Sequence, residues 1–168
     1  MEIIMSDEYT SKFEGITSTA AGDKRVAEYA RKAVIDNEGL MTEDAYFLNA
    51  KTGKPISHSK LGELGGAVEL PSYPGKIIVL HNHPNSKSFS FKDFATINNN
   101  SEIEIMIAAG HDGTVHFIRV GNGKRLDLSD DKGIKQRENT WARLNKEYGD
   151  REALKKITNE LGWIYYVK

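Results

Sequence analysis

Two histidines and an aspartate are the residues whose types and spacing most clearly suggest chemistry in this sequence. His81 and His83 lie two residues apart, directly after the apolar run 76–80. Side chains two apart on a strand point the same way, so both imidazoles can face one ion. Asp93 falls one turn inside a helix that Ser90 would cap. Two imidazole nitrogens and one carboxylate oxygen leave a fourth tetrahedral position for water, as in catalytic zinc sites.

The chain contains no cysteine, and this narrows the chemistry further. The absence excludes disulfides, thiolate zinc sites, cysteine-ligated iron–sulfur clusters and cysteine nucleophiles. Any bound metal must therefore be held by histidine and carboxylate side chains. The sequence predicts an open His/His/Asp site with a reactive water, which favours a catalytic metal over a structural one.

The same residues are similar to the metal motif of a known enzyme family. His81-x-His83-Pro84 followed by Ser90-x-x-Asp93 resembles the motif of the JAMM (JAB/MPN) zinc metallohydrolases. The His-Asn-His-Pro segment is especially similar to the RadC-like branch and its relatives in phages and mobile elements.

The resemblance extends on both sides of the motif. Residues 43–48 stand where the family's first strand begins with its catalytic glutamate, here Glu43. Residues 105–118, with a Gly-His-Asp-Gly turn, look like the family's closing hairpin. The similar region covers roughly residues 40–120. It implies a JAMM/cytidine-deaminase-like α+β fold, in which a mixed, mostly antiparallel sheet is flanked by helices and followed by a helical C-terminal extension.

The resemblance also implies a reaction, the hydrolysis of an amide or isopeptide bond in a peptide or protein-conjugate substrate. Zn²⁺ bound by His81, His83 and Asp93 would lower the pKa of its water from about 15.7 toward about 7. Glu43 would accept the proton and deliver it to the leaving amine. Ser90 would donate a hydrogen bond to the oxyanion.

Simpler interpretations of these residues stay open at the level of the sequence. The segment 90–93 can be an ordinary helix N-cap with an acidic residue in the first turn. The His-x-His pair can be the polar end of a strand. Glu38 and Asp44 are neighbouring alternatives to Glu43 as the base.

Hydrophobic periodicity predicts the elements that must position this site. Apolar residues at helical spacing predict a helix from Asp23 that ends at residues 37–39, and the run 76–80 predicts a strand buried on both faces. Other predicted elements are strands at 45–50, 55–56, 67–70, 103–109 and 114–120, a short helix at 91–98, and two amphipathic helices in the tail, the second closed by Gly162.

These elements divide the chain into three parts. Residues 1–22 are polar and predict a flexible N-terminal arm. Residues 23–128 form the predicted metal-binding domain, and the helices of residues 129–168 are expected to pack on that same domain.

Composition limits the classes of partner. The 168 residues include 23 Lys and Arg against 24 Asp and Glu, a net charge of −1, which fits one domain and lacks the basic excess that nucleic-acid binding favours. No apolar run approaches the roughly 20 residues that a membrane span needs, and the first residues lack signal-peptide features. The expected location is the cytoplasm, with a secreted or injected protein as the alternative.

Two departures from the family pattern concern the substrate. Six residues separate His83 from Ser90, one fewer than is commonest in the family, and the Gly/Pro-rich residues 62–75 replace the long helix of RadC-type proteins. These differences change the groove beside the metal. They motivate an alternative, a non-catalytic JAMM-fold interaction module of a phage or mobile element. A RadC-like DNA-associated protein is less consistent with the net charge.

Overall fold

A six-stranded sheet runs through the middle of the protein. The computed structural model describes residues 3–63 and 70–168. In chain order, its elements are α1 (Asp7–Ser11), α2 (Ala20–Asp36), β1 (Thr42–Asn49), β2 (Pro55–Glu63), β3 (Ile77–His83), α3 (Phe91–Asn99), β4 (Ile103–Gly110), β5 (Val115–Arg119), α4 (Asp131–Tyr148), α5 (Asp150–Leu161) and β6 (Ile164–Val167). Within this described chain the strand order is β2-β1-β3-β4-β5-β6, and β3–β4 is the one parallel pair. The predicted α+β class with a mostly antiparallel sheet is confirmed.

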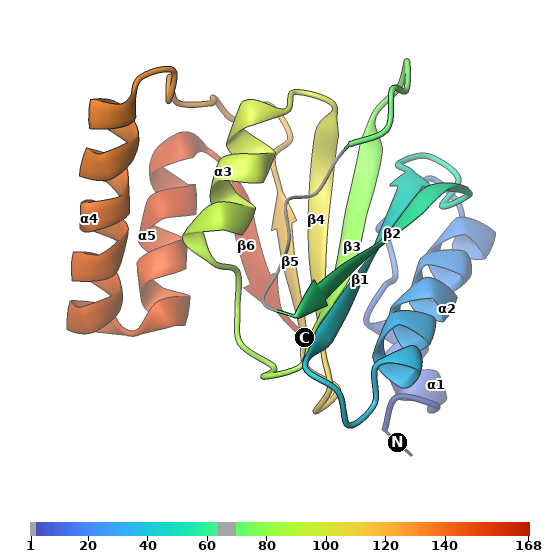
Figure 1. The fold of residues 1–168 in the computed structure, drawn as a ribbon. Helices are drawn as coiled ribbons and strands as arrows, with labels where there is room; N and C mark the ends of the chain where they lie inside the picture. The colour runs from blue at the N-terminus through green and yellow to red at the C-terminus, as the bar shows by residue number, and fades with distance from the viewer. Residues whose placement is uncertain (1–2, 64–69) are drawn as a thin grey trace.

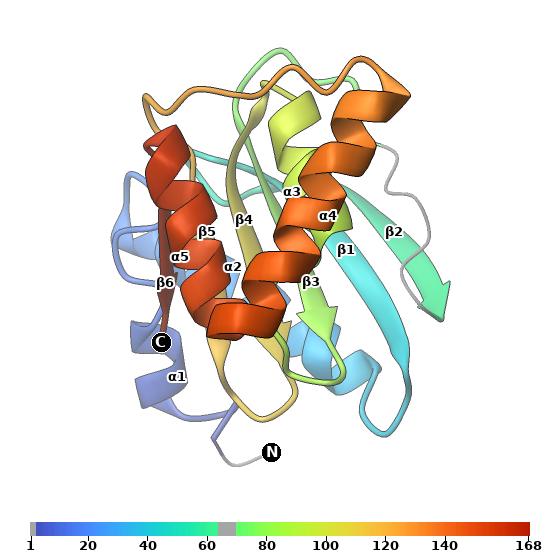
Figure 2. The same ribbon diagram turned by 90° about the vertical axis from the view of Figure 1, so that its left-hand side faces the viewer.

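Helices cover both faces of the sheet (Figures 1 and 2). Helices α1 and α2 lie on one side, which we call the α2 face, and α3, α4 and α5 lie on the other, which we call the groove face. The parallel pair β3–β4 is joined through α3, so the chain crosses the groove face between these two central strands. This crossing brings the start of α3 near the end of β3.

Strand β3 contributes side chains to the cores on both faces of the sheet. All seven of its residues are buried, as the apolar run predicts. Ile78 and Leu80 belong to the core on the α2 face, while Ile77 and Val79 belong to the core on the groove face. Because side chains alternate along a strand, the histidines that continue this second set emerge on the groove face.

Most predicted elements are confirmed. Helix α2 ends at Asp36 as expected but begins at Ala20, because the Thr19 hydroxyl accepts a hydrogen bond from the Gly22 backbone and caps the helix there. The two predicted hairpins form as β1–β2 and β4–β5. Strand β6 was not predicted, although the aromatic and β-branched run after Gly162 is typical of a strand. The strand expected at 67–70 falls mostly outside the described residues.

The N-terminal segment differs from the flexible arm that its polar composition predicts. From residue 3 onward it folds against the α2 face, where α1 starts at a Ser6 cap. The Arg31 guanidinium of α2 donates hydrogen bonds to the carbonyls of Ile4, at 2.7 Å, and Ser6, at 2.8 Å. The buried apolar side chains of the segment are Ile4, Tyr9, Phe13 and Ile16. Their burial outweighs the polar composition, so the segment is part of the core.

The C-terminal helices cover the groove face unequally. Helix α5 buries Ala153, Leu154 and Leu161 against the sheet, and Gly162 ends it in the left-handed conformation. Helix α4 buries no residue and reaches the core through partly buried side chains such as Trp141. None of the helices in the described ranges has the length and hydropathy that crossing a membrane requires.

Candidate metal centre

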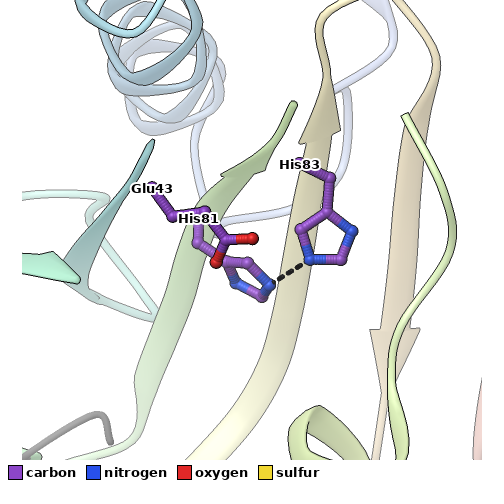
Figure 3. Close-up of side chains that lie close together, drawn as sticks. All are labelled: Glu43, His81 and His83. Atoms are coloured by element: carbon purple, nitrogen blue, oxygen red, sulfur yellow. Dashed lines mark hydrogen bonds between the residues drawn. The ribbon is translucent and has the colours of Figure 1, made fainter. Parts of the chain in front are cut away.

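Three separate elements bring titratable side chains to one place on the groove face. His81 and His83 come from the end of β3, Asp93 from the first turn of α3, and Glu43 from the start of β1. Figure 3 shows the Glu43 carboxylate directed toward the two imidazoles from the neighbouring strand. The register of β1 against β3 pairs Ala45 with His81, so Glu43 and His81 project to the same side.

The polar atoms of these side chains lie within a few ångströms of one another. The Nε2 atoms of His81 and His83 are 2.7 Å apart, and the Asp93 oxygens lie 3.5 Å from His81 Nε2 and 3.6 Å from His83 Nε2. Ligand atoms around a tetrahedral metal with bonds of about 2.0–2.1 Å lie about 3.3 Å apart. The distances from Asp93 to the histidines are close to this value, whereas the two Nε2 atoms are hydrogen bonded to each other and must separate slightly for both rings to bind one ion. Glu43, His81 and His83 also form a group whose ligand atoms all lie within 4.8 Å of one another and can hold a metal ion. Two imidazoles and two carboxylates therefore converge here, and three of these side chains, Glu43, His81 and His83, form the group that could hold a metal ion.

Asp93 is held by the helix that carries it. Its Oδ2 accepts a hydrogen bond from the Ser90 backbone N–H at 2.9 Å, and the Ser90 hydroxyl accepts one from the Asp93 N–H at 3.2 Å. These two bonds form a capping box at the start of α3. The N-cap interpretation and proximity to the histidines are thus both correct, since Oδ1 faces His81 while Oδ2 completes the cap. The cap fixes the carboxylate in place.

The hydrogen bonds of His83 determine which ring nitrogen faces the cluster. Its Nδ1 lies 2.7 Å from the Lys87 carbonyl oxygen, and a carbonyl only accepts, so Nδ1 carries the proton. The lone pair of Nε2 then faces His81, which donates the hydrogen in the bond between the two rings. Orientation by a carbonyl at the far nitrogen is the usual support for a metal-ligating histidine.

The electrostatics of the cluster favour one cation. Burial lowers the pKa of His81, but the Asp93 carboxylate, aided by Glu43, more than offsets this and leaves the pKa above its usual value. Burial and the neighbouring His81 lower the pKa of His83 to about 4. Burial opposes ionisation of Asp93, yet His81 holds the pKa of its carboxyl well below the usual range. The carboxylates of Asp93 and Glu43 thus place negative charge beside the His81 ring, an environment that favours a metal cation.

Glu43 is distinguished from its acidic neighbours by direction. Burial raises the pKa of the Glu43 carboxyl above its usual value, although His81 opposes this. The Asp44 carboxylate points to the opposite face, where it accepts a hydrogen bond from Asn37 at 3.0 Å and lies 3.4 Å from His58 Nε2. Glu38 lies beyond the end of α2 and is exposed. Of the three acidic candidates, Glu43 is the one in the metal-binding group.

The cluster opens into a groove of about 830 Å³. Ser90 lies on its wall, where the hydroxyl that caps α3 keeps its own hydrogen for donation. One side is built by the strands β1, β2, β3 and β4, and the other by the loop of residues 85–89 and the helices α3, α4 and α5. The residues that line it are Glu43, Leu61, Val79, His81, His83, Asn85, Lys87, Ser88, Phe89, Ser90, Lys92, Asp93, Thr96, Met106, Trp141, Asn145 and Asp150.

The C-terminal helices contribute to this groove, which the sequence did not indicate. Trp141 and Asn145 of α4 and Asp150 of α5 lie on its wall. Asp150 accepts a hydrogen bond from the Ser88 hydroxyl at 3.0 Å. Ser88 follows Lys87, whose carbonyl orients His83, so the start of α5 is fastened to the loop that supports a candidate ligand.

Comparisons with known proteins do not identify a relative. No protein-family model matches the chain, and no match was found among the curated proteins or the solved structures.

Proposed function

We propose that this protein is a zinc-dependent hydrolase of the JAMM type that cleaves an amide or isopeptide bond. The convergence of two imidazoles and two carboxylates at the base of a groove carries this proposal. His81, His83 and Asp93 are the proposed ligands, because His83 is oriented by a carbonyl and Asp93 by its capping box. Glu43 is the proposed base, because it comes from a different strand and faces the same point.

The roles of the side chains follow from their positions. When bound, Zn²⁺ supplies a Lewis acid that favours ionisation of water near neutral pH. The Glu43 carboxylate takes a proton from the water that attacks the carbonyl carbon, and passes it to the leaving amine nitrogen. Ser90 Oγ donates a hydrogen bond to the oxygen that becomes negative as the carbon turns tetrahedral. The groove holds the chain on either side of the scissile bond.

The first test measures the metal. The wild-type protein, purified and dialysed against zinc, is expected to retain one Zn²⁺ per chain by mass spectrometry, and His81→Ala is expected to lose it. His58→Ala is the matched control, because His58 stacks on Tyr46 outside the cluster. A folded wild-type protein that retains no zinc would overturn the proposal.

The second test measures the reaction. The zinc-loaded protein is incubated with a library of peptide amides and with isopeptide-linked peptides, and cleavage is followed by mass spectrometry. Glu43→Gln is expected to keep zinc and lose activity by about 10²- to 10⁴-fold, the usual contribution of a general base. Glu147→Gln, at an exposed position of α4, is the control. Zinc binding without cleavage of any substrate would favour the non-catalytic interaction module instead.

A further inference from the structure

The backbone around Glu43 is held in an unusual way. Strands β1 and β3 pair in a regular ladder from Asn49 to Ala45, and this ladder stops at the Ala45–His81 pair. The next residues of β1 continue to pair with β2 on their other side, with an irregularity between Glu43 and Asp44. Glu43 therefore projects toward the candidate metal centre from a point where β1 has separated from β3.

The side chain of Asn82 fills this separation. Its Oδ1 accepts a hydrogen bond from the Asp44 backbone N–H at 2.8 Å, and its Nδ2 donates to the Thr42 carbonyl at 3.0 Å. Thr42 and Asp44 are the two neighbours of Glu43 in the chain. The Asn82 amide thus supplies hydrogen bonds where the pairing between β1 and β3 has ended, and it binds the backbone of the residues on both sides of Glu43.

The orientation of this amide is determined by its partners. The Thr42 carbonyl can only accept and the Asp44 N–H can only donate, so oxygen and nitrogen of the Asn82 amide cannot be exchanged. The second N–H of Nδ2 points to His111 Nε2 at 3.0 Å, which must accept. Asn82 is fully buried, and its two donor hydrogens and its oxygen are all engaged. A side chain bonded in this way has a single arrangement.

Other hydrogen bonds hold residues 42–44 of β1 from the α2 face. Asn37 donates to the Asp44 carboxylate at 3.0 Å and to the Ala33 carbonyl at 2.8 Å, and its oxygen accepts from the Thr42 hydroxyl. Both neighbours of Glu43 are therefore fixed through backbone and side chain together. The Glu43 side chain is the one of the three that faces the metal centre.

We infer that Asn82 is a positioning residue, which holds the Glu43 carboxylate over His81 and His83 by hydrogen bonding the backbone on both sides of it. Asn82 lies between the two histidines on β3, so one residue fixes the distance between base and ligands. Its side chain faces away from the cluster and contacts neither substrate nor metal. The inference rests on the proposed function for the role of Glu43.

The experiment compares Asn82→Ser with Asn98→Ser. Asn98 is a matched control, because it is also buried and its amide also binds backbone, donating to the Leu126 carbonyl at 2.9 Å and accepting from the Leu126 N–H at 2.6 Å. Both substitutions remove a buried backbone clamp, so both are expected to lower the melting temperature. A serine hydroxyl is too short to bridge Thr42 and Asp44.

Catalysis distinguishes the two variants. For the best substrate from the peptide library, Asn82→Ser is expected to lower kcat by about 10- to 100-fold, with KM and zinc affinity changed by less than about threefold. Asn98→Ser is expected to keep kcat. An equal effect of both substitutions on kcat, or an Asn82→Ser loss confined to KM, would overturn the inference. If Asn82→Ser does not fold, Asn82→Asp keeps the acceptor for the Asp44 N–H but sets an oxygen against the Thr42 carbonyl, and is expected to lower kcat by about 10-fold or more. An unchanged kcat in a folded Asn82→Asp would then overturn the inference.

Amide hydrogen exchange keeps this test separate from the proposed function. The exchange rate of the Asp44 N–H in the zinc-loaded protein is expected to rise at least about tenfold in Asn82→Ser and to stay unchanged in Asn98→Ser. If the wild type cleaves nothing, the proposed function fails, and exchange alone decides whether Asn82 holds this segment. An unchanged Asp44 exchange rate in Asn82→Ser would contradict the clamp whatever the activity.

Discussion

The two faces of the sheet differ in how completely helices cover them. Helix α2 has seven buried residues among its 17, whereas α4, with 18 residues, has none. The core of the α2 face also includes the N-terminal segment, whose Phe13 makes edge contacts with Tyr9 and Phe117. On the groove face the incomplete cover leaves about 830 Å³ open above the ends of β1 and β3.

This difference leaves the groove face open to chemistry, although both faces contain a buried apolar core. Apolar groups contribute most where burial is complete, as at Phe13 on the α2 face and Ile97 on the groove face. Ionisable groups such as Glu43 and Asp93 need both partners and access to substrate, which the groove face provides. Each strand of the sheet contributes side chains to both faces. Because side chains alternate along β3, its apolar residues can pack on the α2 face while its histidines face the groove.

The largest expected effect concerns stability on the α2 face. Phe13→Ala is expected to lower the free energy of unfolding by about 3–5 kcal/mol, because Phe13 is fully buried and leaves a cavity. Phe91→Ala is the matched substitution on the groove face, where Phe91 is only partly buried beside Phe94 and Trp141, and is expected to cost about 1–2 kcal/mol. Urea unfolding of both variants without zinc measures the difference. Equal losses would remove the contrast between the faces.

Zinc is expected to stabilise the groove face independently of the opposite core. At a free zinc concentration 100 times the dissociation constant, the free energy of unfolding should rise by about 2.7 kcal/mol. This increment should persist in Phe13→Ala, because distant sites act additively. It should vanish in His81→Ala, because that variant lacks a proposed zinc ligand. Thermal unfolding with and without a chelator measures it. Loss of the increment in Phe13→Ala would show that the two faces are coupled.

Local patterns in the sequence were enough to predict much of this arrangement. The spacing of His81 and His83 fixes their common direction once residues 76–80 form a strand, and the Ser-x-x-Asp pattern predicts the cap that holds Asp93. Both depend on residues a few positions apart. The prediction that Glu43 joins them depended on a family resemblance, because its approach is set by the pairing of β1 with β3.

Features that arise from distant contacts were not predictable in the same way. The Asn82 clamp requires the exact register at which β1 leaves β3, which no pattern within either strand encodes. The walls formed by α4 and α5 depend on how helices near the C-terminus fold back over the sheet. The burial of the N-terminal segment depends on the Arg31 hydrogen bonds, which cross from α2 to residues 4–10. In each case the partner lies more than 20 positions away.

Substitution of Trp141 tests whether this side chain provides the main attachment of α4 to the groove face. Its ring packs against Phe91 and Phe94, with centroids 5.7 and 5.6 Å away. Trp141→Ala is expected to lower the free energy of unfolding by about 1–2 kcal/mol and to speed amide exchange along α4. Tyr148→Ala, at an exposed position of the same helix, should change the free energy by less than about 0.5 kcal/mol. Unaltered exchange in Trp141→Ala would mean that α4 is held by other contacts.

The smallest expected effect is a pH dependence on the groove face, beyond the metal cluster. His116 of β5 is buried, its Nδ1 lies 2.8 Å from the Tyr165 hydroxyl, and burial lowers its pKa. Arg151 lowers the pKa further, while Asp150 opposes this. The folded protein therefore keeps His116 neutral at a pH where the unfolded chain, with a pKa near about 6.5, already binds a proton.

The sign of this effect follows from proton binding. Because the unfolded state binds more protons below pH 6.5 or so, His116 contributes stability that is complete above this pH and is lost as pH falls through its folded pKa. His116→Gln removes that titration but keeps a polar partner for Tyr165. In zinc-free protein, the wild type is expected to lose up to about 1 kcal/mol more than the variant between pH 7.5 and 5.5. Titrating groups that do not interact with His116 are common to both proteins and cancel in this difference, whereas the repulsion between His116 and His83 is part of the effect that the variant removes. Parallel pH profiles would show that His116 titrates alike in both states, and that its burial beside Tyr165 does not exclude the proton.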